Sequence, residues 1–241
     1  VVDIVERYKI SALPVVDENG RMVGVITYED VVEALEDIAD KTIANIGGTR
    51  EDVTEHDPLF LRMIWRAPWL LVTLCAGLIT SSAMIHFERA PWFQYMSFFV
   101  PLIAGMSGNV GLQCSTTLVR SMALGELSYK SRRGAVAREI SIGLLTGTAF
   151  GLLSGFVVFM LYQIGFQSEN QDGFRIGITV ACGLFTACVS ATLLGTFSPF
   201  IFDKYNIDPA VASGPIVTAF NDVLSSQMFF LVASTLYIFL S

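Results

Sequence analysis

The sequence predicts a mainly α-helical membrane protein, in which five transmembrane helices follow a small α/β segment and an amphipathic linker helix. The chain of 241 residues is 53% hydrophobic and only 15% charged, with a mean hydropathy of +0.58. A soluble chain carries roughly 25% charged residues. Much of the charge lies in residues 1–66, and residues 67–241 consist mostly of long apolar runs. The chain therefore divides into a water-exposed segment and a membrane domain.

Five apolar runs are long enough to cross a hydrocarbon core of roughly 30 Å at about 1.5 Å per residue. The runs are continuous rather than alternating, which predicts helices and not the strands of a barrel. The expected spans are residues 67–87, 97–123, 140–166, 176–202 and 211–240. In the third span, glycines recur at every fourth position and predict a smooth face for close helix packing. They are Gly143, Gly147, Gly151 and Gly155.

The distribution of Lys and Arg predicts how the chain is oriented in the cell membrane, because short cytoplasmic loops carry an excess of these residues. The loop 124–139 contains Lys130, Arg132, Arg133 and Arg138. The stretch before the first span adds Arg62 and Arg66, whereas the loops 88–96 and 167–175 contain one Arg each. We therefore expect a cytoplasmic N-terminus and a C-terminus outside.

Residues 1–46 predict a short helix, two strands and a longer helix. The strands are expected at 12–17 and 22–26, and the second helix starts at Tyr28. Thr27 is a suitable N-cap for that helix, and Asp30 complements the helix dipole. Two short strands and a helix cannot bury a core alone, so this segment needs a partner outside itself.

The run Leu13-Pro-Val-Val-Asp17, followed by Gly24-Val-Ile-Thr27-Tyr-Glu-Asp30, resembles the second half of a CBS domain. CBS domains work in pairs and often sense nucleotides or ions. The resemblance implies that Thr27 and Asp30 hold the ribose and phosphate of an adenine nucleotide when the CBS pair is complete. The alternative is that the same two side chains only cap the helix.

Residues 47–66 begin polar and become amphipathic, which predicts a linker helix between the CBS-like segment and the membrane. Its acidic residues are Glu51, Asp52, Glu55 and Asp57. Two interpretations stay open: a solvated linker helix, or a gating element whose carboxylates meet a cation.

Asp222 is expected about 16 Å into the last span, near the midplane of the bilayer. A carboxylate at that depth costs roughly 3 kcal/mol on insertion scales. The other spans offer no matching buried Lys or Arg, so its partner is water, a proton or a cation. The alternative is a protonated side chain hydrogen-bonded within the bundle. Helical spacing places small or polar residues on the face of Asp222; these are Gly214, Thr218, Ser225 and Ser226.

The second span contains the unusual stretch Gly105-Met-Ser-Gly-Asn109-Val-Gly-Leu-Gln113. Three glycines, an Asn and a Gln inside an apolar run predict an irregular or closely approached backbone. Such a backbone is tolerated in a membrane only against protein or a water-filled cavity. Ordinary helix packing is the alternative.

Three motifs of the membrane domain resemble one family: the run from Pro101 to Gln113, the pair Arg138-Glu139, and the run from Asp208 to Asp222. This is the MgtE family of magnesium channels and transporters. The resemblance implies a homodimer whose axial pore is built from the second and fifth spans.

For individual residues, the resemblance implies that Asp222 is the ion-selective carboxylate. Thr218 and Gly214 of the polar face and Asn109 of the second span are the further metal-site candidates. It also implies regulatory Mg²⁺ sites at Asp30 and Glu33. A further acidic pair of the family is replaced here by Lys41-Thr42, which weakens the expectation of strong Mg²⁺ sensing.

The ion chemistry agrees with Mg²⁺, which dehydrates reluctantly and usually binds through one or two carboxylates while keeping several waters. One Asp222 from each of two protomers supplies that number. We therefore expect a channel or transporter for Mg²⁺, with Co²⁺, Mn²⁺ and Ni²⁺ as further possible cargo. The alternative is a proton-coupled transporter in which Asp222 carries the proton.

Two classes of function are disfavoured. The net charge of -7 argues against a nucleic-acid binder. The sequence shows no nucleophile–base pair and no His cluster, so we do not expect an enzyme.

Overall fold

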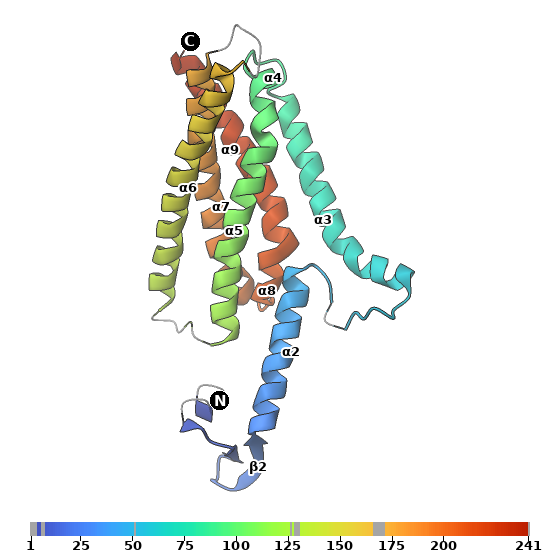
Figure 1. Ribbon diagram of the computed structural model, residues 1–241. Helices are drawn as coiled ribbons and strands as arrows, with labels where there is room; N and C mark the ends of the chain where they lie inside the picture. The colour runs from blue at the N-terminus through green and yellow to red at the C-terminus, as the bar shows by residue number, and fades with distance from the viewer. Residues whose placement is uncertain are drawn as a thin grey trace.

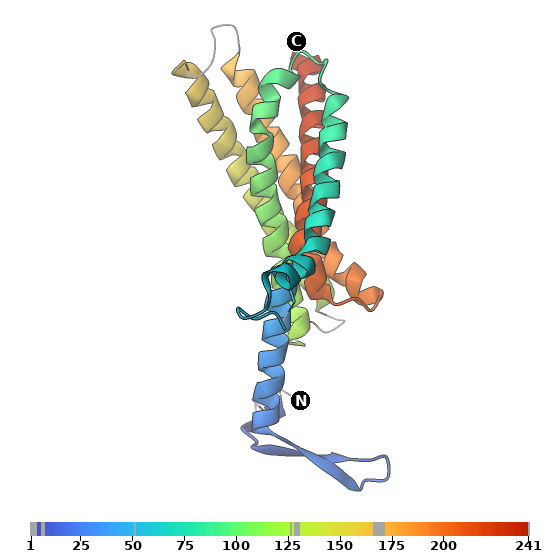
Figure 2. The same ribbon diagram turned by 90° about the vertical axis from the view of Figure 1, so that its right-hand side faces the viewer.

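The computed structural model describes residues 4–5, 8–50, 52–125, 127, 131–165 and 172–240, and shows an upright helical bundle with a narrow extension at one end (Figure 1). Five helical segments of the described residues are long and apolar enough to cross a membrane. The predicted fold class is thereby confirmed. The α/β extension projects from the end of the bundle opposite the C-terminus, as both side views show (Figure 2).

The bundle is built from the following elements, in chain order. The first spanning helix is α3 (Leu59–Ile85). The second comprises α4 (Phe93–Met96), η1 (Ser97–Phe99) and α5 (Val100–Ala123). Next come α6 (Arg132–Gln163) and α7 (Gly173–Lys204). The last comprises α8 (Pro209–Val211), η2 (Ala212–Ile216) and α9 (Val217–Leu240). Helix α7 is central and packs against α5, α6 and α9.

The extension contains the antiparallel strands β1 (Ala12–Val16) and β2 (Met22–Thr27), followed by α2 (Tyr28–Ile46). These match the expected strands and the start of the expected helix. The side chains of Val16, Met22 and Val23 are 57–64% exposed, although all three are apolar. This exposed sheet is consistent with a segment that needs a partner to complete its core.

The linker helix expected over residues 47–66 does not form as one helix. Helix α2 continues to Ile46, where Gly47 caps it and Gly48 has a φ of +66°. Turns follow, and α3 begins at Leu59 after Pro58. Two glycines in succession end a helix readily. The first span is therefore longer than the expected residues 67–87. The third starts at Arg132, eight residues before the expected start, and the remaining spans differ from expectation by up to four residues at their ends.

The glycine face of α6 packs closely against α7, as its spacing predicts. A Cβ atom added to Gly151 would lie 2.8 Å from the Ala181 carbonyl oxygen, and one at Gly155 would lie 2.6 Å from that of Gly177. Only glycine permits so short a separation between the two backbones.

The backbone of the Gly105–Gln113 stretch is regular α-helix, so the expectation of irregularity there is wrong. The alternative expectation, a closely approached backbone, is right, because a Cβ at Gly111 would lie 3.1 Å from the Ala191 carbonyl oxygen of α7. The irregular backbone lies instead in η2, where Gly214 has a φ of −113° and a ψ of −125°. The next residue, Pro215, has no N–H to continue the helix ladder.

Candidate metal site and cation pathway

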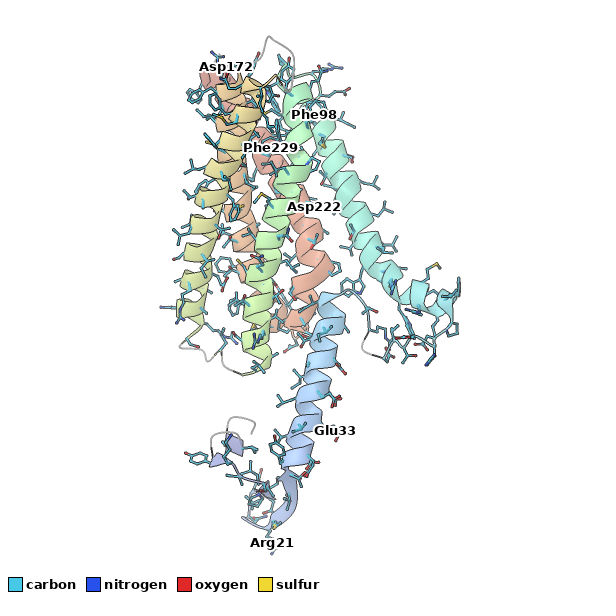
Figure 3. The ribbon with its side chains drawn as sticks, in the orientation of Figure 1. Arg21, Glu33, Phe98, Asp172, Asp222 and Phe229 are labelled. Atoms are coloured by element: carbon cyan, nitrogen blue, oxygen red, sulfur yellow. The ribbon has the colours of Figure 1, made fainter. Side chains whose placement is uncertain are left out.

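Asp222 lies on α9, about halfway along the bundle (Figure 3), and its side chain is partly exposed. Its neighbour Asn221 is buried and fixes the rotation of α9. The Asn221 amide donates to the Ser107 hydroxyl of α5 at 3.1 Å and to the Ala104 carbonyl at 3.4 Å. Because successive helical residues point about 100° apart, an inward Asn221 directs Asp222 away from the α5–α9 contact.

Within the described residues, Asp222 takes part in no ion pair, and no three His, Cys, Asp or Glu side chains cluster as a metal site. One protomer thus presents a single mid-bundle carboxylate on this face. A hydrated divalent ion held by two carboxylates requires a second copy of the chain.

The other expected pore residues differ in accessibility. Thr218 is exposed one turn before Asp222, and its hydroxyl donates to the Gly214 carbonyl at 3.3 Å. Gly214 itself is buried under the end of α2, because a Cβ there would lie 2.5 Å from the Ile46 carbonyl oxygen. Asn109 is exposed on α5. The structure therefore leaves Thr218, Asn109 and Asp222 accessible, and covers Gly214.

Helix α5 carries an exposed polar stripe in the membrane-spanning region. Its polar side chains are four residues apart, at Asn109, Gln113 and Thr117, and the exposed Gly105 continues the same face. Polar side chains facing lipid are unfavourable, and such faces usually meet another helix or a water-filled cavity. The stripe is the second polar surface, after the Asp222 face, that one protomer leaves without a partner.

The end of α2 is fastened to the loop before α8 through one carboxylate. Asn45 donates from its side-chain amide to Oδ2 of Asp208 at 3.2 Å, and the Lys41 ammonium lies 3.9 Å from the same oxygen. The other oxygen, Oδ1, accepts from the Ala210 backbone N–H at 2.9 Å. Helix α2 therefore abuts η2, the irregular turn that leads into α9.

The expected regulatory residues lie far from Asp222, on the projecting part of α2, where Figure 3 marks Glu33. Asp30 and Thr27 form a capping box: Oδ2 of Asp30 accepts from the Thr27 N–H at 2.7 Å, and the Thr27 hydroxyl accepts from the Asp30 N–H at 3.2 Å. The bond from the Thr27 N–H, and after it the bond that the Thr27 hydroxyl donates to the same Oδ2 at 2.7 Å, hold the pKa of the Asp30 carboxyl below its usual range. The capping role is thus visible, and the nucleotide and Mg²⁺ roles of Thr27, Asp30 and Glu33 stay predictions.

The acidic residues between α2 and α3 make local contacts. Asp52 pairs with Arg50 at 2.9 Å, and Asp57 accepts from the Thr54 backbone N–H at 2.7 Å. Glu51, also expected in this group, lies outside the described residues, as does Lys130 of the basic loop.

Glu139 is a buried carboxylate that the sequence interpretation missed, because the third span was expected to start after it. Helix α6 starts at Arg132, so Glu139 lies two turns inside it with 9% of its surface exposed, beside Cys114 of α5. A signal for its burial was present: Glu139 precedes Gly143 by four residues and so shares the glycine face.

The fold and this site together define a multi-pass helical membrane protein with an unpaired carboxylate in its bundle. Comparison with known proteins gives a more specific class. The family model of MgtE, described as a divalent cation transporter, matches residues 100–232, and that of the CBS domain matches residues 1–37. The chain belongs to the MgtE family of divalent cation transporters.

Three curated relatives are each named magnesium transporter MgtE. Those of Bacillus subtilis and Thermus thermophilus are both 31% identical, over 97% and 98% of this chain, and that of Enterococcus faecalis is 30% identical over 97%. The chain spans about half the length of these relatives, 50–51%.

A shorter similarity, 39% identity over 64 residues, joins the chain to an inosine-5'-monophosphate dehydrogenase of Methanocaldococcus jannaschii. This similarity covers 25% of this chain and only 13% of that enzyme, so it does not indicate that the chain shares the enzyme's activity. The family is one of transporters, in agreement with the expectation that the chain is not an enzyme.

Proposed function

We propose that the chain is the membrane part of a Mg²⁺ transporter, in which Asp222 attracts the hydrated ion into a pore between two protomers. The observation that carries this proposal is the unpaired, partly exposed Asp222 on the same protomer as the exposed polar stripe of α5. If two copies meet with these surfaces toward the axis, the polar side chains face water and each other rather than lipid.

The choice of Mg²⁺ rests on two supports. The relatives that match over nearly the whole chain are named magnesium transporters. In addition, two Asp222 carboxylates are a suitable set for an ion that keeps several of its waters, whereas Ca²⁺ takes six to eight oxygen ligands.

Ion uptake by the full-length protein in liposomes tests the proposal. We expect a Mg²⁺-sensitive dye inside the liposomes to report uptake that protein-free liposomes lack. Parallel runs with Co²⁺, Mn²⁺ and Ni²⁺ rank the cargo. No Mg²⁺ uptake above the protein-free control would contradict the proposal, and uptake that requires a pH gradient would favour proton coupling instead.

The proposed domain division is a partial CBS domain at residues 1–46, a linker at 47–66 and a pore domain at 67–241. In this arrangement α2 transmits the state of the CBS region to the pore, because its end is fastened to Asp208 and covers Gly214. The Lys41–Asp208 pair is partly exposed, and such pairs are worth about 0.2–1 kcal/mol.

Releasing α2 is therefore expected to have a modest effect. In Asp208→Ala, the contacts to Lys41 and Asn45 are lost, and Mg²⁺ uptake should rise about two- to fivefold, in proportion to the lost contact energy. Asp203→Ala is the matched control, because Asp203 pairs with Arg132 of α6 instead of α2. Equal uptake by both variants would contradict a restraining role for α2.

The proposed orientation places the basic start of α6 in the cytoplasm and α4 outside. A cysteine at Gly134, where an added Cβ meets no neighbouring atom, should resist an impermeant thiol reagent applied to intact cells. A cysteine at the exposed Gln94 of α4 should be labelled under the same conditions. The reverse labelling pattern would invert the topology.

A further inference from the structure

A cavity of about 290 Å³ lies at the end of the bundle where α7 begins and α9 ends. Figure 3 marks Asp172 at this end, beside the upper ends of the helices. Its lining comes from three parts of the chain: the segment around α4, the first turns of α7 and the last turns of α9. Because α7 and α9 both span the membrane, the cavity lies at the level of the lipid headgroups.

The floor of the cavity is apolar and well packed. Trp92, Met96, Ile176 and Ala233 line it, and each is at most 6% exposed. Trp92 is held in place by Phe87 and Phe230, whose ring centroids lie 5.7 and 6.0 Å from its own. The floor is therefore built by the core of the bundle rather than by mobile surface side chains.

The rim is polar and includes an ion pair between two half-exposed side chains. Arg175 Nε lies 3.1 Å from Oδ2 of Asp172, while Oδ1 of Asp172 accepts from the Phe174 backbone N–H at 3.0 Å. Asp172 is thus anchored to the helix start and holds Arg175 through Nε. Arg175 lines the cavity, and in the described residues neither of its terminal nitrogens has a hydrogen-bond partner, so their donors are available to a ligand at the rim.

We propose that this cavity binds the phosphodiester headgroup of a membrane phospholipid. The paired donors of a guanidinium match two phosphate oxygens. An amine on the headgroup would face the Asp172 carboxylate and the rings of Tyr95 and Tyr237, which also line the cavity. The apolar floor accepts the glycerol and the first methylenes, and Trp and Tyr at this depth are typical of the membrane interface.

Thermal unfolding of the full-length protein in detergent tests the proposal, because a ligand that binds the folded state raises Tm. Dioctanoylphosphatidylethanolamine should give a saturable rise in Tm. In Arg175→Gln, the concentration at half-saturation should increase at least about tenfold, as expected for a lost charge-assisted hydrogen bond. Arg89→Gln is the control, since Arg89 is an exposed arginine near the same end that does not line the cavity.

Two further arms separate the sources of the ligand. Dioctanoylglycerol, which has the same chains without phosphate, should give no saturable rise, and neither should inorganic phosphate at millimolar concentration. Equal half-saturation for Arg175→Gln and the unmodified protein would overturn the site. Equal effects of dioctanoylglycerol would overturn the role of the phosphate, and equal effects of inorganic phosphate would show a free-anion site instead of a lipid site.

Discussion

Replacing Asp222 with Asn is expected to lower Mg²⁺ uptake at least about 100-fold, because it removes the one mid-bundle carboxylate that the described residues present on the face of the proposed pore. At about 4 Å and an effective dielectric constant of about 20, one pair of unit charges interacts by about 4 kcal/mol. A tenfold change corresponds to about 1.4 kcal/mol. In a dimer the substitution removes both carboxylates at once. The hydrated Mg²⁺ then loses the negative charge that favours its transfer from bulk water into the pore.

The same substitution should leave the fold intact. Asp222 takes part in no ion pair in the described part of the chain, and its removal relieves a burial cost of roughly 3 kcal/mol. Asp222→Asn and Asp222→Ala should therefore unfold at or above the temperature of the unmodified protein. Asp203→Asn, which neutralises a carboxylate at the end of α7, should transport normally. If both Asp222 variants took up Mg²⁺ at the rate of the unmodified protein, Asp222 would have a structural role only and the proposed pore would be contradicted.

Replacing Gly195 with Ala is expected to cause the largest loss of stability of the variants considered. A Cβ atom at Gly195 of α7 would overlap the Gly111 carbonyl group of α5, which is backbone and cannot rotate away. Forcing extra volume into a packed contact costs about 1–3 kcal/mol. The two helices would have to separate, which also shifts the α5 face that lines the proposed pore.

Gly77→Ala of α3 is the matched control for this experiment. A Cβ at Gly77 meets no atom within 4 Å, so the substitution should be neutral or gain up to about 1 kcal/mol in helix propensity. Thermal unfolding of both variants in detergent gives the comparison. Equal unfolding temperatures for Gly195→Ala and Gly77→Ala would show that the α5–α7 contact is looser than the structure indicates.

The spans and the glycine face of α6 were predictable from the sequence because both depend on local composition and spacing. An apolar run of sufficient length needs no tertiary information to be recognised. The glycine spacing also predicts a face for close packing, whereas the partner of that face, Ala181 of α7 beside Gly151, is known only from the structure.

The boundary between α2 and α3 was not predicted, because amphipathic spacing over residues 47–66 suggested a helix. The signals against that helix were the Gly47-Gly48 pair and Pro58, and they outweigh periodicity. The irregular turn at Gly214-Pro215 carried a similar signal, whereas the glycines of α5 serve close packing on a regular helix.

At the site, Asp222 was predictable because a lone carboxylate in an apolar run has a high cost. The direction of Asp222 was not, since it depends on the contact between Asn221 and Ser107, residues far apart in the sequence. The burial of Gly214 under α2 likewise depends on how two distant segments meet.

The most direct test of the proposed pathway is the water accessibility of α9 around Asp222, measured during transport. The cysteines at 75, 114, 182 and 188 are all free, so single cysteines are best placed in a background without them. Thr218→Cys lies on the exposed face one turn before Asp222, and Phe220→Cys lies on a different face, which borders an apolar groove against α3.

A charged, water-soluble thiol reagent should react with Thr218→Cys in reconstituted protein, block Mg²⁺ uptake, and react more slowly when Mg²⁺ is present. It should leave Phe220→Cys unmodified and active, because that face borders the apolar groove against α3 and not the proposed pore. Modification of Phe220→Cys with block of uptake, and an inert Thr218→Cys, would place the cation path on a different face of α9 and contradict the proposed pore.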